Sequence, residues 1–358
     1  MLFKKKNLEL KFNLGKANIM NTNPDIEIER IKLIRKIEKE VKIKFKLPKN
    51  FLLSDLYIYN DNKKEDPIMC TLVTKNPIKK KLYEFINKKT NLAIKELNSI
   101  KSNRSNSIKK TKLKKDIKLE YKSNSVVIPK NQYNRIKKYI IKKDFDKYMN
   151  FNTLIWILYY RYNKLHLYNN SQGAVNPKYY EIFSNKYKTN VEAFGSFFNH
   201  TLKYYFGLFP DLEKYFGCLG NFYLSTFKKG IYIVNPPFTV IAINKTINFL
   251  INQLDNTKKE LTFLLVIPTW INSDRKKLNK KCKIKLDTKY EDELFIDKLK
   301  KSGYITQYYL YCKENFIYYD YIKMRETQFA PTTLITLSNK NKKLELNEIF
   351  GIEDIRII

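Results

Sequence analysis

Apolar runs of strand length alternate with helix-like segments in the second half of the chain. Residues 230–234 (GIYIV), 261–268 (LTFLLVIP) and 331–339 (PTTLITLSN) are nearly continuous apolar runs, which predict strands buried on both faces. Residues 240–254 (VIAINKTINFLINQL) predict a helix between the first two strands. Buried strands separated by helices indicate an α/β fold with a mostly parallel, doubly wound sheet.

The first part of the chain has a helical pattern and is rich in lysine. Residues 24–41 carry isoleucines three positions apart, which predicts an amphipathic helix, and a second helix is expected over residues 77–97. Residues 99–122 are rich in Ser, Asn and Lys. This stretch is either a solvated, flexible loop or an arm that becomes ordered on phosphate.

The middle of the chain connects these two regions. Residues 131–168 predict one or two amphipathic helices around Trp156, and the turn-rich stretch 169–177 ends them. Residues 178–187 and 197–209 are expected to be helical. We therefore expect a basic, mainly helical region over residues 1–130, RNA-binding or accessory, and a second domain over 131–358, with a helical lead-in and an α/β core from about residue 188.

Charge limits the function classes. The 358 residues include 69 Lys and Arg against 35 Asp and Glu, a formal net charge of +34. A polyanion would offset this self-repulsion, so nucleic acid is the leading partner, although the base composition of an AT-rich genome also enriches Lys, Asn, Ile and Tyr. Four cysteines without a CxxC pair and two histidines argue against a metal site. No apolar run approaches 18 residues, so we expect no membrane partner.

A rigid corner follows the strand at residues 230–234. Asn235, Pro236, Pro237 and Phe238 stand where an open α/β sheet binds its ligands, beyond the carboxyl end of a strand. Two prolines fix the backbone, so the carbonyl of Pro236 and the amide oxygen of Asn235 can accept from the two N–H groups of an exocyclic amine. Phe238 can stack on a flipped base. Catalysis there needs orientation and electrostatics rather than a strong base.

The tetrapeptide resembles the [D/N/S]PP[Y/F/W] signature of S-adenosylmethionine-dependent N6-adenine and N4-cytosine methyltransferases. Taken alone it could also be a Pro-Pro turn with an aromatic plug. Further segments occur in a fixed order around it: SQGAVNPKYYEIF (171–183), VEAFGSFFN (191–199), FPDLEKYFGCLG (209–220), NPPF (235–238), IPTW (267–270), the Lys313-Glu314 pair and PTTLITLSN (331–339).

This ordered set resembles the cap-specific adenosine N6-methyltransferases, the phosphorylated C-terminal-domain interacting factor family. The resemblance covers roughly residues 150–339, and the set is far more specific than NPPF alone. It implies a Rossmann-like class I methyltransferase domain that uses S-adenosylmethionine. The implied reaction methylates N6 of the first transcribed 2′-O-methyladenosine beside a 7-methylguanosine cap, so capped mRNA is the expected partner.

The resemblance also implies site residues. The catalytic corner that holds the adenine would be Asn235, Pro236, Pro237 and Phe238. The cofactor would be lined by Glu192, Phe194, Gly195, Ser196, Asn199, Asp211, Phe216 and Gly217. Gly195 and Ser196 would allow close backbone approach to the cofactor. Asp211 would accept from a ribose hydroxyl or an amine, or else cap a helix.

The chain departs from animal members of the family in one respect. Those members carry an N-terminal WW module, whereas Trp156 and Trp270 are the only tryptophans here and do not have WW spacing. Direct electrostatic capture of RNA is the expected substitute. Two alternatives stay open: an N6-adenine enzyme of DNA or internal RNA, and a non-catalytic RNA-binding subunit. We expect an intracellular protein of nucleus or cytoplasm, or of a viral factory if the AT-biased composition reflects a large DNA virus of a protist.

Overall fold

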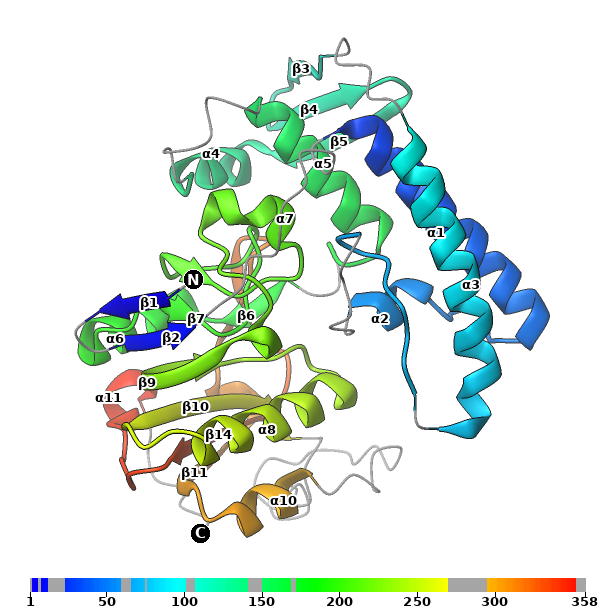
Figure 1. The fold of residues 1–358 in the computed structure, drawn as a ribbon. Helices are drawn as coiled ribbons and strands as arrows, with labels where there is room; N and C mark the ends of the chain where they lie inside the picture. The colour runs from blue at the N-terminus through cyan, green and yellow to red at the C-terminus, as the bar shows by residue number, and fades with distance from the viewer. Residues whose placement is uncertain are drawn as a thin grey trace. The chain divides into compact units, whose positions relative to one another are not determined.

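The computed structural model describes residues 2–5, 8–11, 23–58, 66–74, 76–100, 107–140, 150–168, 172–269 and 295–351 (Figure 1). These residues belong to two compact units. The first unit comprises Met1–Asn13, Ser171–Gly207 and Leu219–Ile358, and the second comprises Leu14–Asn170 and Leu208–Cys218. The two units therefore do not follow chain order.

The first unit is built on an eight-stranded mixed sheet. Its strands are β1 (Leu2–Lys5), β2 (Leu8–Lys11), β7 (Val191–Glu192), β8 (Tyr204–Tyr205), β9 (Thr226–Val234), β10 (Leu261–Pro268), β11 (Ile305–Tyr311) and β14 (Thr332–Ser338). The strands β8, β7, β9 and β10 lie side by side and parallel. Antiparallel pairs extend this centre, with β2 and β1 beside β9 and with β14 between β10 and β11. The expected α/β fold with a mainly parallel central sheet is confirmed.

Both faces of this sheet are covered, which explains the continuous apolar runs. Along β9, Tyr232 and Val234 belong to one core cluster and Ile231 and Ile233 to another. The first face is covered by α8 (Val240–Asp255), which Figure 1 shows beside β9 and β10. The second core cluster takes in buried residues of two helices and of a small sheet. These elements are α6 (Pro177–Tyr187), α11 (Leu346–Phe350) and, in the small sheet, β6 (Gly173–Val175) and β12 (Tyr318–Asp320). The third strand of the small sheet, β13 (Arg325–Thr327), pairs with β12. A further helix of the unit, α10, spans Phe295–Ser302.

The second unit combines helices with a small antiparallel sheet. Its elements are α1 (Pro24–Phe45), α2 (Leu53–Ile58), α3 (Pro77–Ser99), β3 (Lys109–Lys112), β4 (Asp116–Tyr121), β5 (Asn124–Pro129), α4 (Lys130–Lys138), α5 (Phe151–Lys164) and α7 (Pro210–Glu213). Helix α1 begins where the side chain of Asn23 accepts from the backbone N–H of Asp25 at 2.8 Å. Its isoleucine stripe is buried, and α1 packs against α3 and α5. No described helix of the protein is both long and apolar enough to cross a membrane.

Two secondary-structure predictions were wrong. Residues 197–209 form turns and the short strand β8 instead of a helix, because buried side chains hydrogen-bond the backbone of this segment. Residues 107–122 form the hairpin strands β3 and β4 rather than a loop or a flexible arm, since Ile117, Leu119 and Tyr121 alternate and are buried. The helices predicted over 24–41 and 77–97 are confirmed.

Candidate active site at the carboxyl edge of the sheet

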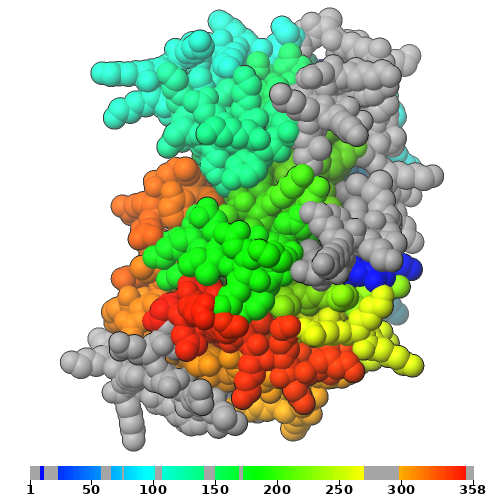
Figure 2. Space-filling view, turned by 90° about the vertical axis from the view of Figure 1, so that its left-hand side faces the viewer, coloured from blue at the N-terminus to red at the C-terminus, as the bar shows by residue number. Residues whose placement is uncertain are grey.

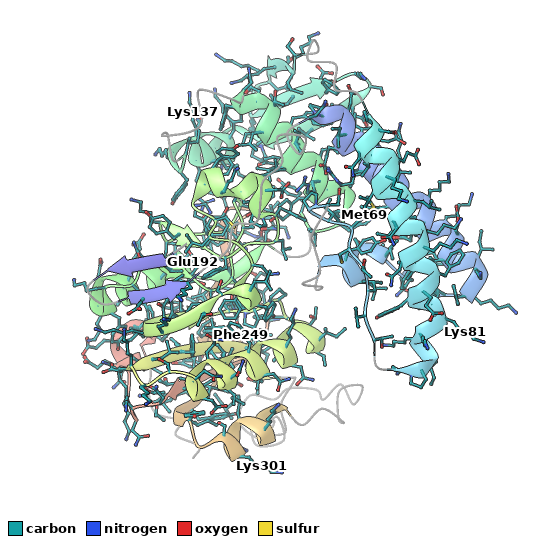
Figure 3. The ribbon with its side chains drawn as sticks, in the orientation of Figure 1. Met69, Lys81, Lys137, Glu192, Phe249 and Lys301 are labelled. Atoms are coloured by element: carbon teal, nitrogen blue, oxygen red, sulfur yellow. The ribbon has the colours of Figure 1, made fainter. Side chains whose placement is uncertain are left out.

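Two of the sequence segments with family-like motifs leave the sheet next to each other. Glu192, the last residue of β7, pairs with Ile233 of the parallel strand β9, and the N–H of Ala193 donates to the carbonyl of Ile233 at 3.3 Å. The chain leads from β7 to β8 on one side and from β9 to β10 on the other, so the strand order reverses between β7 and β9. Ligands bind open α/β sheets at such a switch point. Figure 3 labels Glu192 at this position.

The side chain of Asn235 is held in one orientation. Its Nδ2 donates to the carbonyl of Val266 in β10 at 3.0 Å. This bond identifies the nitrogen and directs Oδ1 away from the strand. Within the described part of the chain, no donor is bonded to Oδ1, and the residue is half-buried. An acceptor is therefore available at the end of β9.

The backbone beyond Asn235 provides a second acceptor. The N–H of Thr239 donates to the carbonyl of Pro237 at 2.7 Å, and the Thr239 hydroxyl accepts from the N–H of Ala242 at 3.3 Å, which caps α8. The carbonyl of Pro236, by contrast, receives no hydrogen bond from any described residue. The corner is thus tied to β10 at Asn235 and to α8 at Thr239, and its two acceptors, one of them on the buried residue Pro236, have no described hydrogen-bond partner.

Phe238 is partly buried and partly accessible. Its ring meets that of Tyr318 edge to face, with centroids 5.7 Å apart and an interplanar angle of 79°. The Tyr318 hydroxyl in turn lies 2.6 Å from the Thr332 hydroxyl, which fixes the supporting ring. The plug and the stacking-platform interpretations of Phe238 are therefore compatible: one part of the ring packs on the core, and the rest remains accessible.

If Phe238 stacks on a base of RNA, as the sequence predicts, Phe238→Ala should weaken RNA binding about 5- to 150-fold, because base–aromatic stacking contributes roughly 1–3 kcal/mol per base. The apparent KM for RNA in a methyl-transfer assay measures this change. Phe238→Trp should stay near the wild-type value. Phe329→Ala is the matched control, since the Phe329 ring also contacts Tyr318, at 5.4 Å, and is 42% exposed. Equal losses in both alanine variants would contradict a specific role for Phe238.

The side chains of the segment after β7 mainly bind one another. Glu192 is buried, and its Oε1 accepts from the backbone N–H groups of Thr201 and Leu202. The N–H of Ser196 donates to Oδ1 of Asn199 at 2.8 Å, and the Ser196 hydroxyl donates to Oε1 of Gln172 at 2.7 Å. Glu192, Ser196 and Asn199 therefore fix the conformation of this loop. The loop in turn places its backbone at the carboxyl edge of the sheet.

Phe194 and Gly195 pack where this loop passes β8. The Phe194 ring lies 4.6 Å from that of Phe222, and the N–H of Gly195 donates to the carbonyl of Phe206 at 2.9 Å. A Cβ on Gly195 would lie 3.1 Å from Cβ of Tyr205. Close packing against Tyr205 therefore gives a structural reason for this glycine, alongside the close cofactor approach expected from the sequence.

Asp211, Phe216 and Gly217 belong to the second unit. Asp211 lies in the first turn of α7, but the cap residue Phe209 has no side-chain cap bond. Both Asp211 carboxylate oxygens instead accept from Nη1 of Arg161, at 3.0 and 2.9 Å. The helix-capping alternative for Asp211 is therefore wrong. Phe216 is fully buried, and Gly217 ends this short helical segment at φ 98°, in the left-handed region that favours glycine.

Sequence reasoning missed the buried charge network that holds Asp211. Arg161 of α5 is fully buried; its Nε donates to Oε1 of Glu27 at 2.9 Å and its Nη2 to Oε2 at 2.8 Å. Arg30 joins Glu27 to Asp66, from which its Nε lies 2.8 Å away. Burial raises the pKa of the Asp211 carboxyl although Arg161 opposes it. Burial alone would lower the pKa of Arg161, but Asp211 and Glu27 raise it above its ordinary value. The available signal was Arg161 itself, a charge inside the apolar run LIWILYYRY.

The comparison with protein families matches residues 119–307 to the family described as "Phosphorylated CTD interacting factor 1 WW domain". The match includes both the segment after β7 and the corner after β9. Trp156 falls inside it but is a fully buried residue of α5, so it offers no surface to a proline-rich peptide, and Trp270 lies outside the described residues. The match spans more than half of the 358 residues, and the chain belongs to the phosphorylated CTD interacting factor 1 family.

Proposed function

We propose that this protein is an S-adenosylmethionine-dependent methyltransferase that acts on N6 of the adenosine next to an mRNA cap. The observation that carries the proposal is the pair of available acceptors, Oδ1 of Asn235 and the carbonyl of Pro236, at the switch point of the sheet. Membership of a methyltransferase family supports the reaction class. The position of the target adenosine, next to the cap, is inferred from the resemblance of the ordered motifs to those of the cap-specific methyltransferases.

The corner would act by holding and polarising an amine. Each N–H of the adenine amine would donate to one of the two acceptors, which keeps electron density on nitrogen and directs its lone pair away from them. The ring of Phe238 would support the base. S-adenosylmethionine, when bound, supplies an electrophilic methyl group on sulfur. Asn235 and Pro236 would hold the amine toward that methyl group, and the proton that the amine loses after transfer would pass to solvent.

The loop after β7 suits a cofactor held mainly through backbone. Its polar side chains bind protein groups, Glu192 and Asn199 within the loop and Ser196 also at Gln172, and the loop leaves the same sheet edge as the corner. We propose that Phe194 and Gly195 contribute to the cofactor site with them. For Asp211, Phe216 and Gly217 the proposed cofactor role rests on the resemblance, and the Arg161 contact limits the freedom of the Asp211 carboxylate.

The test is methyl transfer from labelled S-adenosylmethionine to a panel of nucleic acids. Capped RNAs that begin with A, 2′-O-methyl-A or G are compared with uncapped RNA and duplex DNA. We expect transfer to capped RNA beginning with adenosine, and strongest transfer to the 2′-O-methylated form. Equal transfer to uncapped RNA or to duplex DNA would refute the cap-adjacent assignment. Absence of any transfer would refute the proposal that the protein is a methyltransferase.

A further inference from the structure

One short region of the second unit is much more basic than the average of the chain. Residues 107–140 contain eleven Lys or Arg and two acidic residues, whereas the whole chain has 69 against 35. The ratio of basic to acidic residues is about two for the whole chain but more than five for residues 107–140. A uniform compositional bias toward lysine would raise both ratios alike, so it does not account for this concentration.

The fold gathers part of this charge on one surface. The N–H of Lys130, the first residue of α4, donates to the carbonyl of Lys115 in the β3–β4 turn at 3.0 Å. We call four exposed lysines of the hairpin and of this junction the basic hairpin patch: Lys112, Lys114, Lys115 and Lys130. Figure 2 shows long side chains of this part of the chain (cyan to teal) projecting from the surface, and Figure 3 labels Lys137 farther along α4.

Other lysines of the region have partners. Lys118 forms an ion pair with Glu120 at 2.7 Å, Lys122 with Asp25, and Nζ of Lys110 donates to the Tyr133 hydroxyl at 2.9 Å. The four patch lysines form no ion pair with an acidic residue that the structure describes, whereas Lys109 lies opposite Glu120 in the β3–β4 pair. The fold thus gives lysines on either side of the patch partners within the protein and leaves the patch itself positive.

Ordinary structural roles explain only part of the patch. Lysines on an edge strand such as β3 discourage strand addition, which accounts for Lys112. Lys114 and Lys115 lie in the turn. Lys130 is in the first turn of α4, where the helix dipole disfavours a cation. Bringing Lys115 and Lys130 together costs free energy in the isolated protein, and a bound polyanion would offset this cost.

We infer that the basic hairpin patch binds the phosphate backbone of the RNA strand that carries the methylated adenosine. This inference rests on the proposed function for the identity of the RNA. An anionic lipid surface is the less favoured partner, because the buried residues of α4 (Gln132, Tyr133 and Ile136) include its apolar ones, so α4 has no apolar face to insert into a bilayer.

The test is RNA binding by the full chain carrying Lys112→Glu, Lys114→Glu and Lys115→Glu, measured by fluorescence anisotropy over a range of salt concentrations. The probe is a capped single-stranded RNA of about 20 nucleotides. We expect Kd to rise at least tenfold and the slope of log K against log salt to fall by about two, near 0.7 for each lost phosphate contact. Circular dichroism checks that the variant is folded.

The matched control reverses three other exposed lysines of the same unit, Lys79, Lys80 and Lys81 of α3, of which Figure 3 labels Lys81. It changes net charge equally, and we expect Kd to stay within about threefold of wild type. The patch does not bind RNA if both variants weaken RNA binding equally, or if neither weakens it. The same conclusion follows if the patch variant loses binding to phosphatidylserine vesicles but keeps its RNA affinity. An RNA-binding patch on a protein that methylates nothing would overturn only the proposed function, whereas full RNA affinity in an active patch variant would overturn only the patch.

Discussion

Replacing Asn235 by alanine is expected to lower kcat for methyl transfer roughly 10²- to 10³-fold, the loss typical when one preorganised hydrogen-bonding group is removed from an active site. The change deletes one of the two acceptors proposed for the adenine amine. It also deletes the bond from Nδ2 to Val266, but Asn235 is half-buried at the end of β9, so we expect a loss of stability of only about 1 kcal/mol. Single-turnover methyl transfer and thermal unfolding measure the two effects separately.

Asn256→Ala is the matched control for this variant. Asn256 also donates through Nδ2 to a backbone carbonyl, that of Asn252 at 2.7 Å, but it is exposed at the carboxyl end of α8. Its removal should leave kcat unchanged. Asn235→Ser, which keeps a smaller acceptor and stays within the signature, should recover part of the activity. If Asn235→Ala retains wild-type kcat, the amide does not take part in catalysis.

The corner could be predicted from sequence because its signals are local. Two prolines exclude strand and helix at Pro236 and Pro237 whatever surrounds them, and the apolar runs on either side predict β9 and α8 by their periods. The orientation of the Asn235 amide was not predictable, since it depends on Val266, which lies 31 residues away in β10. The sequence predicted which side chains stand at the corner, and the tertiary contacts decide which of their atoms are available.

The segment after β7 shows where local patterns fail. Residues 197–209 have an apolar spacing that predicts a helix, but β7 and β8 are each only two residues long and the chain between them turns sharply. The turns are stabilised by bonds that no periodicity encodes, such as those from the N–H groups of Thr201 and Leu202 to the buried carboxylate of Glu192. Buried polar side chains can thus override propensity when they satisfy backbone groups.

The region predicted over residues 1–130 contains strands of the first unit as well as helices of the second. Strands β1 and β2 extend the sheet of the first unit, because β2 pairs with β9. Helix α1 contributes Glu27 to a buried network with Arg161, 134 residues away in sequence. Pairing over such separations leaves no trace in a single sequence, apart from a charged residue inside an apolar helix. The helical region is therefore bound to the motif segment at Asp211 within one unit, through α5.

Arg161→Met should destabilise the second unit by about 3–5 kcal/mol, because it leaves Glu27 and Asp211 buried without the guanidinium that binds both. Arg161 is fully buried, so solvent cannot replace these bonds. Urea unfolding monitored by circular dichroism measures the loss. Arg35→Met is the matched control: Arg35 is exposed on α1, and its replacement should change the free energy of unfolding by no more than about 0.5 kcal/mol.

A double variant separates the unpaired charge from lost packing. Adding Asp211→Asn to Arg161→Met removes one of the two carboxylates that lose the Arg161 guanidinium, so we expect the double variant to be more stable than Arg161→Met alone, with a coupling energy of about 0.5–3 kcal/mol. If Asp211→Asn makes Arg161→Met less stable by its full single-variant cost, the two side chains act independently and the network does not stabilise the unit. Recovery in the double variant would show that the ion pair holds the Asp211 segment in place and that Arg161 is needed chiefly because its partners are buried charges.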